Sequence, residues 1–360
     1  MARLGDYVKI KTGKLDANES SENGQYPFFT CSVEPLKIDT YSYDCECVLV
    51  AGNGDLNVKY YNGKFDAYQR TYIIESKDKK ILSVPYLYCF LDGYVEELRK
   101  QSIGGVIKYI KLGNLTEAQI PMCSITEQNE IVENLNKVNT LIILRKQQLS
   151  KLDELVKSRF IELFGDIASY PQCVGVPLGT ICTTLSGGTP TTKVPEYYEG
   201  DIPWISTPYL GNNHINGSSA KAYITEEAIK NSATHLIPAN TIMFGIRVGV
   251  GKSSVIDEPM CANQDIVALM GIDTSKYNLL FVKHVLDAYQ SHFDSIKKGA
   301  TILGITTEDL KKVLIPTADI EIQNQFAAFV EQTDKSKFEI QQSLEKLETL
   351  KKALMQKYFG

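Results

Sequence analysis

Residues 149–165 read LSKLDELVKSRFIELFG, and residues 344–360 read LEKLETLKKALMQKYFG, 195 positions further along the chain. The two stretches share leucines, lysines and a closing Phe-Gly at the same places, so one is a copy of the other. Each closes a longer segment in which apolar residues recur at alternating steps of three and four. That spacing places the apolar residues on one face of a helix and, over about thirty residues, indicates a coiled coil.

Two long helices are therefore expected, and a helix of about 38 residues is about 57 Å long. Thr126 is the expected N-cap of the first helix, and Gly165 its expected C-terminal cap. We expect the helices to pair antiparallel as a stiff spacer between two globular regions; the alternative is a helical core packed on those regions. The apolar positions are Ile131, Leu135, Val138, Ile142, Leu149, Leu152, Val156 and Leu163, interrupted by Arg145 and Arg159, and then Phe326, Val330, Phe338, Ile340, Leu344, Leu347, Leu350 and Leu354.

The duplication extends upstream of the helices. The same shift of 195 superposes Ile120-Pro121 on Ile315-Pro316, Gln128-Asn129 on Gln323-Asn324, Gly54 on Gly249, Ala67 and Gln69 on Ala262 and Gln264, and Gly104 on Gly299. Near the start, Leu4-Gly5 matches Leu178-Gly179 with a shift of 174, so the second copy holds 21 extra residues, mostly between Trp204 and Met243. One duplication with one insertion accounts for nearly the whole chain.

Each copy opens with a strand-rich region that ends in a helix. The expected strands are Cys47–Ala51, Val58–Tyr61 and Thr71–Ile74 in the first copy, and Thr241–Phe244, Ser253–Ile256 and Ile266–Leu269 in the second. Helices are expected near 85–100 and near 277–297. The predicted fold class is α+β, with two pseudo-repeated domains at 1–122 and 166–317 and helical spacers at 123–165 and 318–360.

Composition is that of an ordinary globular protein, with 43% hydrophobic and 22% charged residues among 360. Apolar runs fall short of the roughly 18 residues that a membrane span needs, and residues 1–6 lack a secretory signal, so we expect a cytoplasmic protein without membrane contact. Eight scattered cysteines predict buried free thiols. The four histidines lack metal-binding spacing, although His284 and His292 are placed to share one helix face; neither a metal nor a cofactor is expected.

Three near matches to catalytic motifs fail on inspection. Gly249–Ser253 resembles a phosphate-binding loop, but Ile246 stands where glycine is needed and a strand is expected to follow. Val50–Gly54 resembles a loop that binds S-adenosylmethionine, and Ser206–Tyr209 resembles a methyltransferase motif, but each departs from its pattern and they fall in different copies. The sequence therefore predicts a protein that is not an enzyme.

An ordered set of motifs along nearly the whole chain resembles the specificity subunits of type I restriction–modification systems. The motifs are Ser158–Asp166, Leu178-Gly179, Ser186–Pro190, Ile202–Ile205, Val250–Lys252, Ile256–Pro259, Ala262–Asp265, and Ile315-Pro316 followed by Gln323. The first copy departs more, with Lys11–Lys14 where the second has Ser186–Thr189, and Tyr68–Arg70 where the second has Asn263–Asp265. The resemblance therefore transfers residue by residue more securely in the second copy.

The resemblance implies a division of labour. Each globular domain reads one half of a split target in double-stranded DNA, the helices fix the gap between the halves, and two modification (methyltransferase) subunits dock on the helices. Restriction (endonuclease and translocase) subunits can join, while the specificity subunit holds no active site. The net charge of −5 suggests that a protein partner supplies part of the positive field. Two other classes stay open: a stand-alone S-adenosylmethionine-dependent DNA methyltransferase, and a coiled-coil scaffold that does not bind DNA.

Candidate DNA-contacting residues follow from groove chemistry. Arginine suits guanine, and asparagine and glutamine suit adenine. The candidate base readers are Gln69, Arg70, Arg247, Asn263 and Gln264. The candidate phosphate contacts, which include backbone amides, are Lys14, Lys59, Lys64, Gly187, Gly188, Thr189, Lys193, Lys252 and Ser253, with Lys11 as a further lysine expected in a loop. For each of them an ordinary surface or turn role is an equal alternative, and Gln69 and Gln264 could instead be buried between strands.

Overall fold

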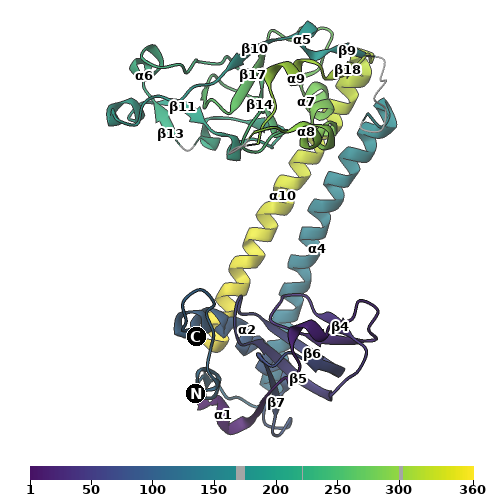
Figure 1. Cartoon of the computed structure of the whole chain (residues 1–360), viewed down its shortest axis with the longest axis vertical. Helices are drawn as coiled ribbons and strands as arrows, with labels where there is room; N and C mark the ends of the chain where they lie inside the picture. The colour runs from purple at the N-terminus through teal and green to yellow at the C-terminus, as the bar shows by residue number, and fades with distance from the viewer. Residues whose placement is uncertain (168–174, 221, 300–302) are drawn as a thin grey trace. The chain divides into compact units, whose positions relative to one another are not determined.

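The computed structural model describes residues 1–167, 175–220, 222–299 and 303–360. The chain forms two compact units, unit 1 (Met1–Gln148 and Ile340–Gly360) and unit 2 (Leu149–Glu339). Two long helices, α4 (Ile125–Phe164) and α10 (Ile320–Phe359), contribute residues to both units (Figure 1). Each unit thus combines one strand-rich region with part of each long helix.

Unit 1 is built on a sheet of six strands in the order β2-β7-β5-β6-β3-β4, in which β3 and β6 run parallel and the other pairs antiparallel. A two-stranded sheet pairs β1 with β8. The elements are β1 (Ala2–Arg3), α1 (Leu4–Tyr7), β2 (Val8–Thr12), η1 (Ala17–Glu19), β3 (Tyr26–Phe29), β4 (Leu36–Ile38), β5 (Tyr43–Ala51), β6 (Val58–Ala67), β7 (Thr71–Ser76), α2 (Val84–Gln101), α3 (Leu112–Thr116) and β8 (Gln119–Ile120).

Unit 2 divides its strands among sheets ordered β10-β17-β14-β15-β12, β13-β11-β16 and β18-β9. The elements are β9 (Gly175–Pro177), α5 (Leu178–Ile181), β10 (Thr183–Ser186), η2 (Pro195–Tyr198), β11 (Ile202–Ile205), η3 (Thr207–Tyr209), β12 (His214–Ile215), η4 (Gly217–Ser219), β13 (Ala222–Ile224), α6 (Glu226–Lys230), β14 (Thr241–Gly245), β15 (Ser253–Ile256), β16 (Cys261–Ala262), β17 (Ile266–Met270), α7 (Leu279–Ala288), α8 (Gln290–Ile296), α9 (Thr307–Lys311) and β18 (Leu314–Pro316). The six predicted strands are confirmed.

Strand register confirms the duplication. The order β2-β7-β5-β6 in unit 1 corresponds to β10-β17-β14-β15 in unit 2. Ala2 pairs with Ile120, and Val176 pairs with Ile315, so the shifts of 174 and 195 hold across one strand pair. The segment that carries the insertion forms η3, β12, η4, β13 and α6.

Two glycines explain one of the sequence matches physically. Gly54 and Gly249 both adopt φ +69°. Side chains with a Cβ rarely adopt this left-handed conformation, so glycine is required at the same turn in both copies. The match between Gly54 and Gly249 thus reflects a shared backbone conformation.

The unit 1 sheet is buried on both faces of its central strands. Along β5, Val48 and Val50 pack with Leu87 and Phe90 of α2, which lies beside the sheet (Figure 1). Cys47 and Leu49 alternate onto the other face, where they join a cluster with Phe29 and Phe65. Burying one such large side chain contributes about 1.5–3 kcal/mol, so α2 holds the sheet firmly.

The core of unit 2 joins both long helices to the strand-rich region. Phe160 of α4 contacts Phe326 of α10 with ring centroids 5.4 Å apart, and Phe164 contacts Phe281 of α7 at 4.6 Å. The prediction of a single helix near 277–297 is wrong, because the helix is interrupted at Tyr289, between α7 and α8. His284 and His292 therefore lie on different helices and do not share a face.

The apolar stripe of α4 is confirmed, since each of its predicted positions is buried or half-buried. On α10 the prediction is wrong at Phe338 and Leu350, which are 65% and 46% exposed. The positions that continue the buried stripe of α10 are the neighbouring residues Lys337 and Lys351, which are half-buried. Lys337 pairs with Asp153, and Lys351 lies 3.8 Å from Asp92, so charged residues occupy positions that a hydrophobic pattern cannot reveal.

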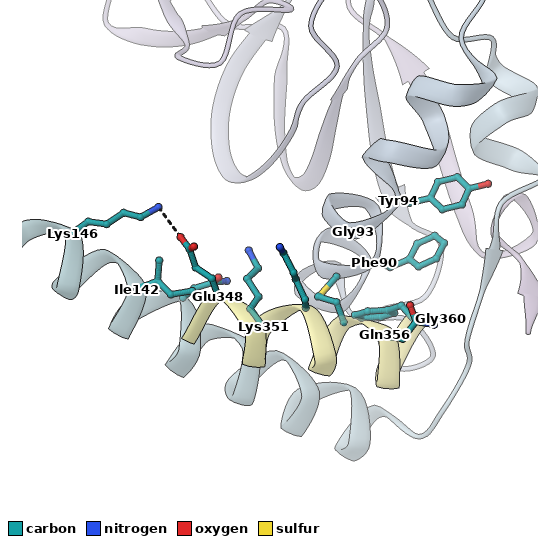
Figure 2. A pocket seen from close by; sticks show the side chains of 13 residues that line it. Phe90, Gly93, Tyr94, Ile142, Lys146, Glu348, Lys351, Gln356 and Gly360 are labelled. Atoms are coloured by element: carbon teal, nitrogen blue, oxygen red, sulfur yellow. Dashed lines mark ion pairs between the residues drawn. The ribbon is translucent and has the colours of Figure 1, made fainter. Parts of the chain in front are cut away.

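Antiparallel pairing of the two helices is seen within each unit. In unit 1, Phe359 packs on the same core as Ile131, while Glu348 pairs with Lys146 at 3.4 Å. Figure 2 shows this ion pair at the edge of a 660 Å³ pocket between α2, α4 and α10. In unit 2, Phe326 packs on Phe160 and Lys337 pairs with Asp153. In both units residue numbers rise on one helix as they fall on the other.

The helix caps are partly as predicted. Gly165 adopts φ +82° and its N–H donates to the Ile161 carbonyl at 2.8 Å, which confirms the C-terminal cap. Thr126 is not the N-cap. Ser124 takes that place, because its Oγ accepts from the Glu127 N–H and the Glu127 carboxylate accepts from the Ser124 N–H. This reciprocal pair is a capping box.

A buried glutamine attaches each long helix to its strand-rich region. Gln128 of α4 accepts from the N–H of Ser83, the N-cap of α2, and donates to the carbonyls of Ile81 and Cys123. Gln323 of α10 makes the equivalent bonds to Asn278, the N-cap of α7, and to the carbonyls of Lys276 and Ala318. The glutamine and all three of its partners are related between the copies by the shift of 195. The repeated Gln-Asn pair in the sequence therefore marks a repeated structural clamp.

In the part of the chain that the structure describes, the cysteines are free thiols, and no helix meets the length and hydropathy of a membrane span. Among the described residues seven cysteines are free: Cys47, Cys89, Cys182 and Cys261 are buried, and Cys31, Cys45 and Cys123 are half-buried. Cys173 lies outside the described residues. Within the described ranges, every helix is too short or too polar to cross a membrane.

Candidate nucleic-acid interface

The same exposed turn occurs in both units. In unit 1 it joins β6 to β7, where the Thr71 N–H donates to the Tyr68 carbonyl at 2.8 Å and Gln69 and Arg70 project into solvent. In unit 2 it joins β16 to β17, where the Ile266 N–H donates to the Asn263 carbonyl at 3.1 Å and Gln264 is exposed. Gln69 and Gln264 are therefore surface residues, and the alternative of a buried role between strands is wrong.

A glycine is seated against each of these turns. The Gly13 N–H donates to the Thr71 carbonyl at 3.0 Å, and the Gly187 N–H donates to the Ile266 carbonyl at 2.9 Å. The Gly188 N–H likewise donates to the Ala262 carbonyl at 2.8 Å. These amide hydrogens are used inside the protein and are not free for a phosphate. The backbone amides of Gly187 and Gly188 are therefore no longer candidate phosphate contacts.

Replacing Gly187 by alanine is expected to destabilise unit 2. A Cβ at this position would lie 2.2 Å from the Asn263 carbonyl oxygen, so the backbone must shift. Overpacking of this kind typically costs about 1–3 kcal/mol. Urea unfolding followed by the fluorescence of Trp204, which lies in unit 2 with Gly187, measures the effect against the unaltered chain. Equal stability of the variant and the unaltered chain would contradict the packing role.

Polar side chains around the unit 2 turn hold one another in place. The Thr189 hydroxyl donates to the Gln264 side-chain oxygen, which leaves the Gln264 amide hydrogens free to face a ligand. Asn263 donates to the Asp265 carboxylate at 3.3 Å, and Arg247 lies 3.6 Å from the same carboxylate. Arg247 remains 51% exposed, so it is oriented by Asp265 without being buried. Contacts within the turn thus orient the polar side chains of Gln264, Asn263 and Arg247.

Three other unit 2 candidates are placed differently. Ser253 is fully buried in β15 and its hydroxyl donates to Asp287, so it is not a surface contact. Lys252 is exposed at the end of the β14–β15 loop. Lys193 is exposed in the loop that precedes η2. The two lysines remain candidates, and Ser253 does not.

Three of the four candidate lysines of unit 1 lie on strands and not in the expected loops. Lys11 is on β2 and pairs with Glu75 at 2.9 Å, while Lys64 is on β6 with its ammonium 4.6 Å from the Tyr41 ring centre. Lys59, also on β6, is half-buried and donates to Asn57, and burial lowers the pKa of its ammonium. Lys14 is exposed in the loop after β2. Lys14 and Lys64 are the better phosphate candidates because both are exposed and neither is paired with a carboxylate among the described residues, whereas Lys11 pairs with Glu75 and Lys59 is half-buried.

One segment beside these turns was missed in the sequence. Residues 103–109 form an exposed hairpin whose base is bonded to the chain just after β5. The available signal was the glycine pair Gly104-Gly105 followed by Val106-Ile107, an apolar pair in a turn-like context. The repeat matches Gly104 with Gly299, and in unit 2 Lys298 and Gly304 exchange backbone hydrogen bonds as Ile103 and Tyr109 do in unit 1.

A comparison with known families matches this architecture. The model of the family described as "Type I restriction modification DNA specificity domain" matches residues 1–154 and 174–352. The chain belongs to this family. The two matched stretches follow the duplication, with one specificity domain in each half of the sequence.

Relatives of this DNA specificity family are similar over most of the chain. The type I restriction enzyme EcoDI specificity subunit of Escherichia coli is 26% identical over 99% of this chain and 86% of its own length. The EcoR124I/EcoR124II specificity subunit of Escherichia coli is 27% identical over 73% of this chain and 66% of that protein. The crystal structure of a type I restriction–modification S subunit from M. genitalium shares the fold, with a TM-score of 0.64 at 15% identity over 100% of this chain and 95% of the other.

Proposed function

We propose that the chain is the specificity subunit of a type I restriction–modification complex and reads a bipartite, asymmetric DNA target. The observation that carries this proposal is the repeated exposed turn, with Gln69 in unit 1 and Gln264 in unit 2. Their neighbours differ, because Arg70 stands in one turn where Asp265 stands in the other. Arg70 is exposed and can donate to guanine, whereas Asp265 is largely buried beside Arg247, so the two turns present different groups to the bases.

Each part of the chain has a proposed task. The domains at 1–122 and 166–317 each read one half-site, and the helical segments at 123–165 and 318–360 set the unread gap. Base edges are read by Gln69, Arg70, Arg247, Asn263 and Gln264. Phosphates are held chiefly by Lys14, Lys64, Lys193 and Lys252, which position the domain without reading sequence, while the Thr189 hydroxyl orients Gln264.

The helices are proposed to bind two modification subunits. Ile143 and Phe338 occupy equivalent positions in the repeat and are 55% and 65% exposed, and Leu155 and Leu350 form a second exposed, equivalent pair. Exposed apolar side chains on a helix favour a protein partner. Because these two pairs are related by the repeat, two copies of one partner can use equivalent contacts. Restriction subunits would join the assembly through this core.

Catalysis is assigned to the partners. Val50–Gly54, which resembles a loop for S-adenosylmethionine, lies in unit 1, while Ser206–Tyr209 lies in unit 2. A methyltransferase site needs both elements around one cofactor, and this distribution does not favour such a site. We therefore propose that the modification subunits transfer the methyl group and that this chain selects where.

Methylation mapping tests the proposed function. DNA from cells that carry this gene with and without the gene of its modification subunit is sequenced by a single-molecule method that detects methylated bases. A split, asymmetric methylated motif is expected when both genes are present and absent when either is missing. A motif that persists without the modification gene would make this chain the enzyme. No motif under either condition would leave the coiled-coil scaffold.

A further inference from the structure

The hairpin at residues 103–109 presents apolar side chains to solvent. Val106 is fully exposed and Ile107 is 62% exposed, and Ile103 and Tyr109 are exposed beside them. Single exposed apolar residues are common on protein surfaces, but a cluster of four within one short hairpin marks an interaction site.

The hairpin is held in a defined position. The Ile103 N–H donates to the Tyr109 carbonyl at 3.0 Å, and the Tyr109 N–H donates back to Ile103 at 2.9 Å. The Gly54 N–H donates to the Lys108 carbonyl at 2.9 Å, which ties the returning arm to the loop after β5. These backbone bonds fix where the tip, Val106-Ile107, projects.

The same loop connects the hairpin to the base-reading turn. The Ile110 N–H donates to the Gly52 carbonyl at 2.9 Å, and the Gly52 N–H donates to the Arg70 carbonyl at 2.8 Å. Gly52 is thus bonded on one side to the hairpin and on the other to the turn. The base of the hairpin and the turn that carries the exposed Gln69 and Arg70 are therefore bonded to the same residue of unit 1, and Lys108 is exposed on the hairpin.

Unit 2 repeats this construction. The N–H groups and carbonyls of Lys298 and Gly304 bond to each other at 2.8 and 3.0 Å, as Ile103 and Tyr109 do in unit 1. The Ile305 N–H donates to Ile246, and the Ile246 N–H donates to Asp265, both at 2.8 Å. Leu303 is 57% exposed, and residues 300–302 lie outside the described residues. An apolar side chain beside the base-reading turn is therefore a feature of both copies.

We infer that the hairpin at 103–109 enters the major groove, where Val106 and Ile107 contact thymine methyl groups. This inference rests on the proposed function. The thymine methyl is the apolar group that base pairs present in the major groove, and the groove admits a two-stranded ribbon. The hydrogen-bonded connection to the turn of Gln69 and Arg70 and the exposed Lys108 ammonium favour DNA over a protein surface.

A thymine-to-uracil series tests the contact. The full chain, assembled with its modification subunits, is titrated with a duplex that holds the mapped target, and each thymine is replaced in turn by uracil, which lacks the methyl group. Val106→Ser and Ile107→Ser are expected to weaken binding by about fourfold to tenfold. One uracil position in one half-site should weaken binding of the unaltered complex similarly, yet weaken the variants less, because the contact is already lost. Ile81→Ser, another exposed apolar residue of unit 1, should bind normally.

The possible results separate the inference from the function on which it rests. If the loss of binding caused by uracil and the loss caused by the serine substitutions add in full at every position, the methyl contact is overturned. A half-site that contains no A·T pair would also overturn it. Variants that bind DNA normally but lose the modification subunits on gel filtration would make the hairpin a protein-binding element and overturn it too. If the unaltered complex does not bind the mapped duplex, the proposed function fails and the inference with it. Normal binding by the unaltered complex and by both variants overturns the inference alone.

Discussion

Replacing Gln323 by leucine is expected to lower the free energy of unfolding of unit 2 by about 3 kcal/mol. The Gln323 side chain is fully buried and makes three hydrogen bonds to backbone groups, to the Asn278 N–H and to the carbonyls of Lys276 and Ala318. Leucine fills a similar volume but leaves those three groups without their partner. An unsatisfied buried group costs about 1–3 kcal/mol, and some of the three will regain water in the variant.

The chain provides both a probe and matched controls for this experiment. Its single tryptophan, Trp204, lies in unit 2, so its fluorescence during urea unfolding reports on that unit. Gln325→Leu makes the same chemical change at an exposed position of α10 and should shift stability by less than about 0.5 kcal/mol. Gln128→Leu breaks the equivalent clamp in unit 1. A Trp204 transition that moves no further for Gln323→Leu than for Gln325→Leu would show that the clamp does not stabilise the unit.

The repeat was the most informative feature of the sequence, because a shift in residue number predicts shared backbone geometry. The repeat aligns Gly54 with Gly249, and both adopt the same left-handed backbone conformation. Gln128 and Gln323 were matched in the same way, and both clamp a helix to the N-cap of another. What the sequence could not provide was the reason for each match, which lies in hydrogen bonds between segments far apart in the chain.

Errors arose where local pattern and tertiary contact disagree. Phe338 was assigned to the buried stripe because it is apolar, but Lys337 occupies that position and is neutralised by Asp153. Ser253 is predicted as a phosphate contact because serine hydroxyls can bind phosphate, but it is the first residue of a buried strand. Gly187 and Gly188 are predicted as phosphate contacts, whereas their N–H groups already bond within unit 2. In each case the partner that decides the role is distant in sequence.

Gln69→Ala and Gln264→Ala are expected to relax sequence selectivity in different half-sites. The two glutamines occupy equivalent exposed turns in separate units, so each is the matched control for the other. A glutamine that bonds adenine at two points discriminates against other bases by about 1–3 kcal/mol, which is roughly tenfold to a hundredfold. Each variant should therefore lose that much discrimination at one base pair of its own half-site. Overall affinity should fall less, because phosphate contacts carry much of the binding.

Methylation mapping of cells that carry each variant together with the modification subunit measures this selectivity at every target position. Gln69→Ala should broaden one half of the motif, Gln264→Ala the other half, and Gln325→Ala neither, since Gln325 lies on α10 and belongs to neither turn. Thr189→Ala should reproduce part of the Gln264→Ala effect, because the Thr189 hydroxyl orients the Gln264 amide. If one glutamine variant broadened both halves, the turns would not read separate half-sites. If neither did so, base reading would belong to other residues of these domains, while the division of the target between two domains would still stand.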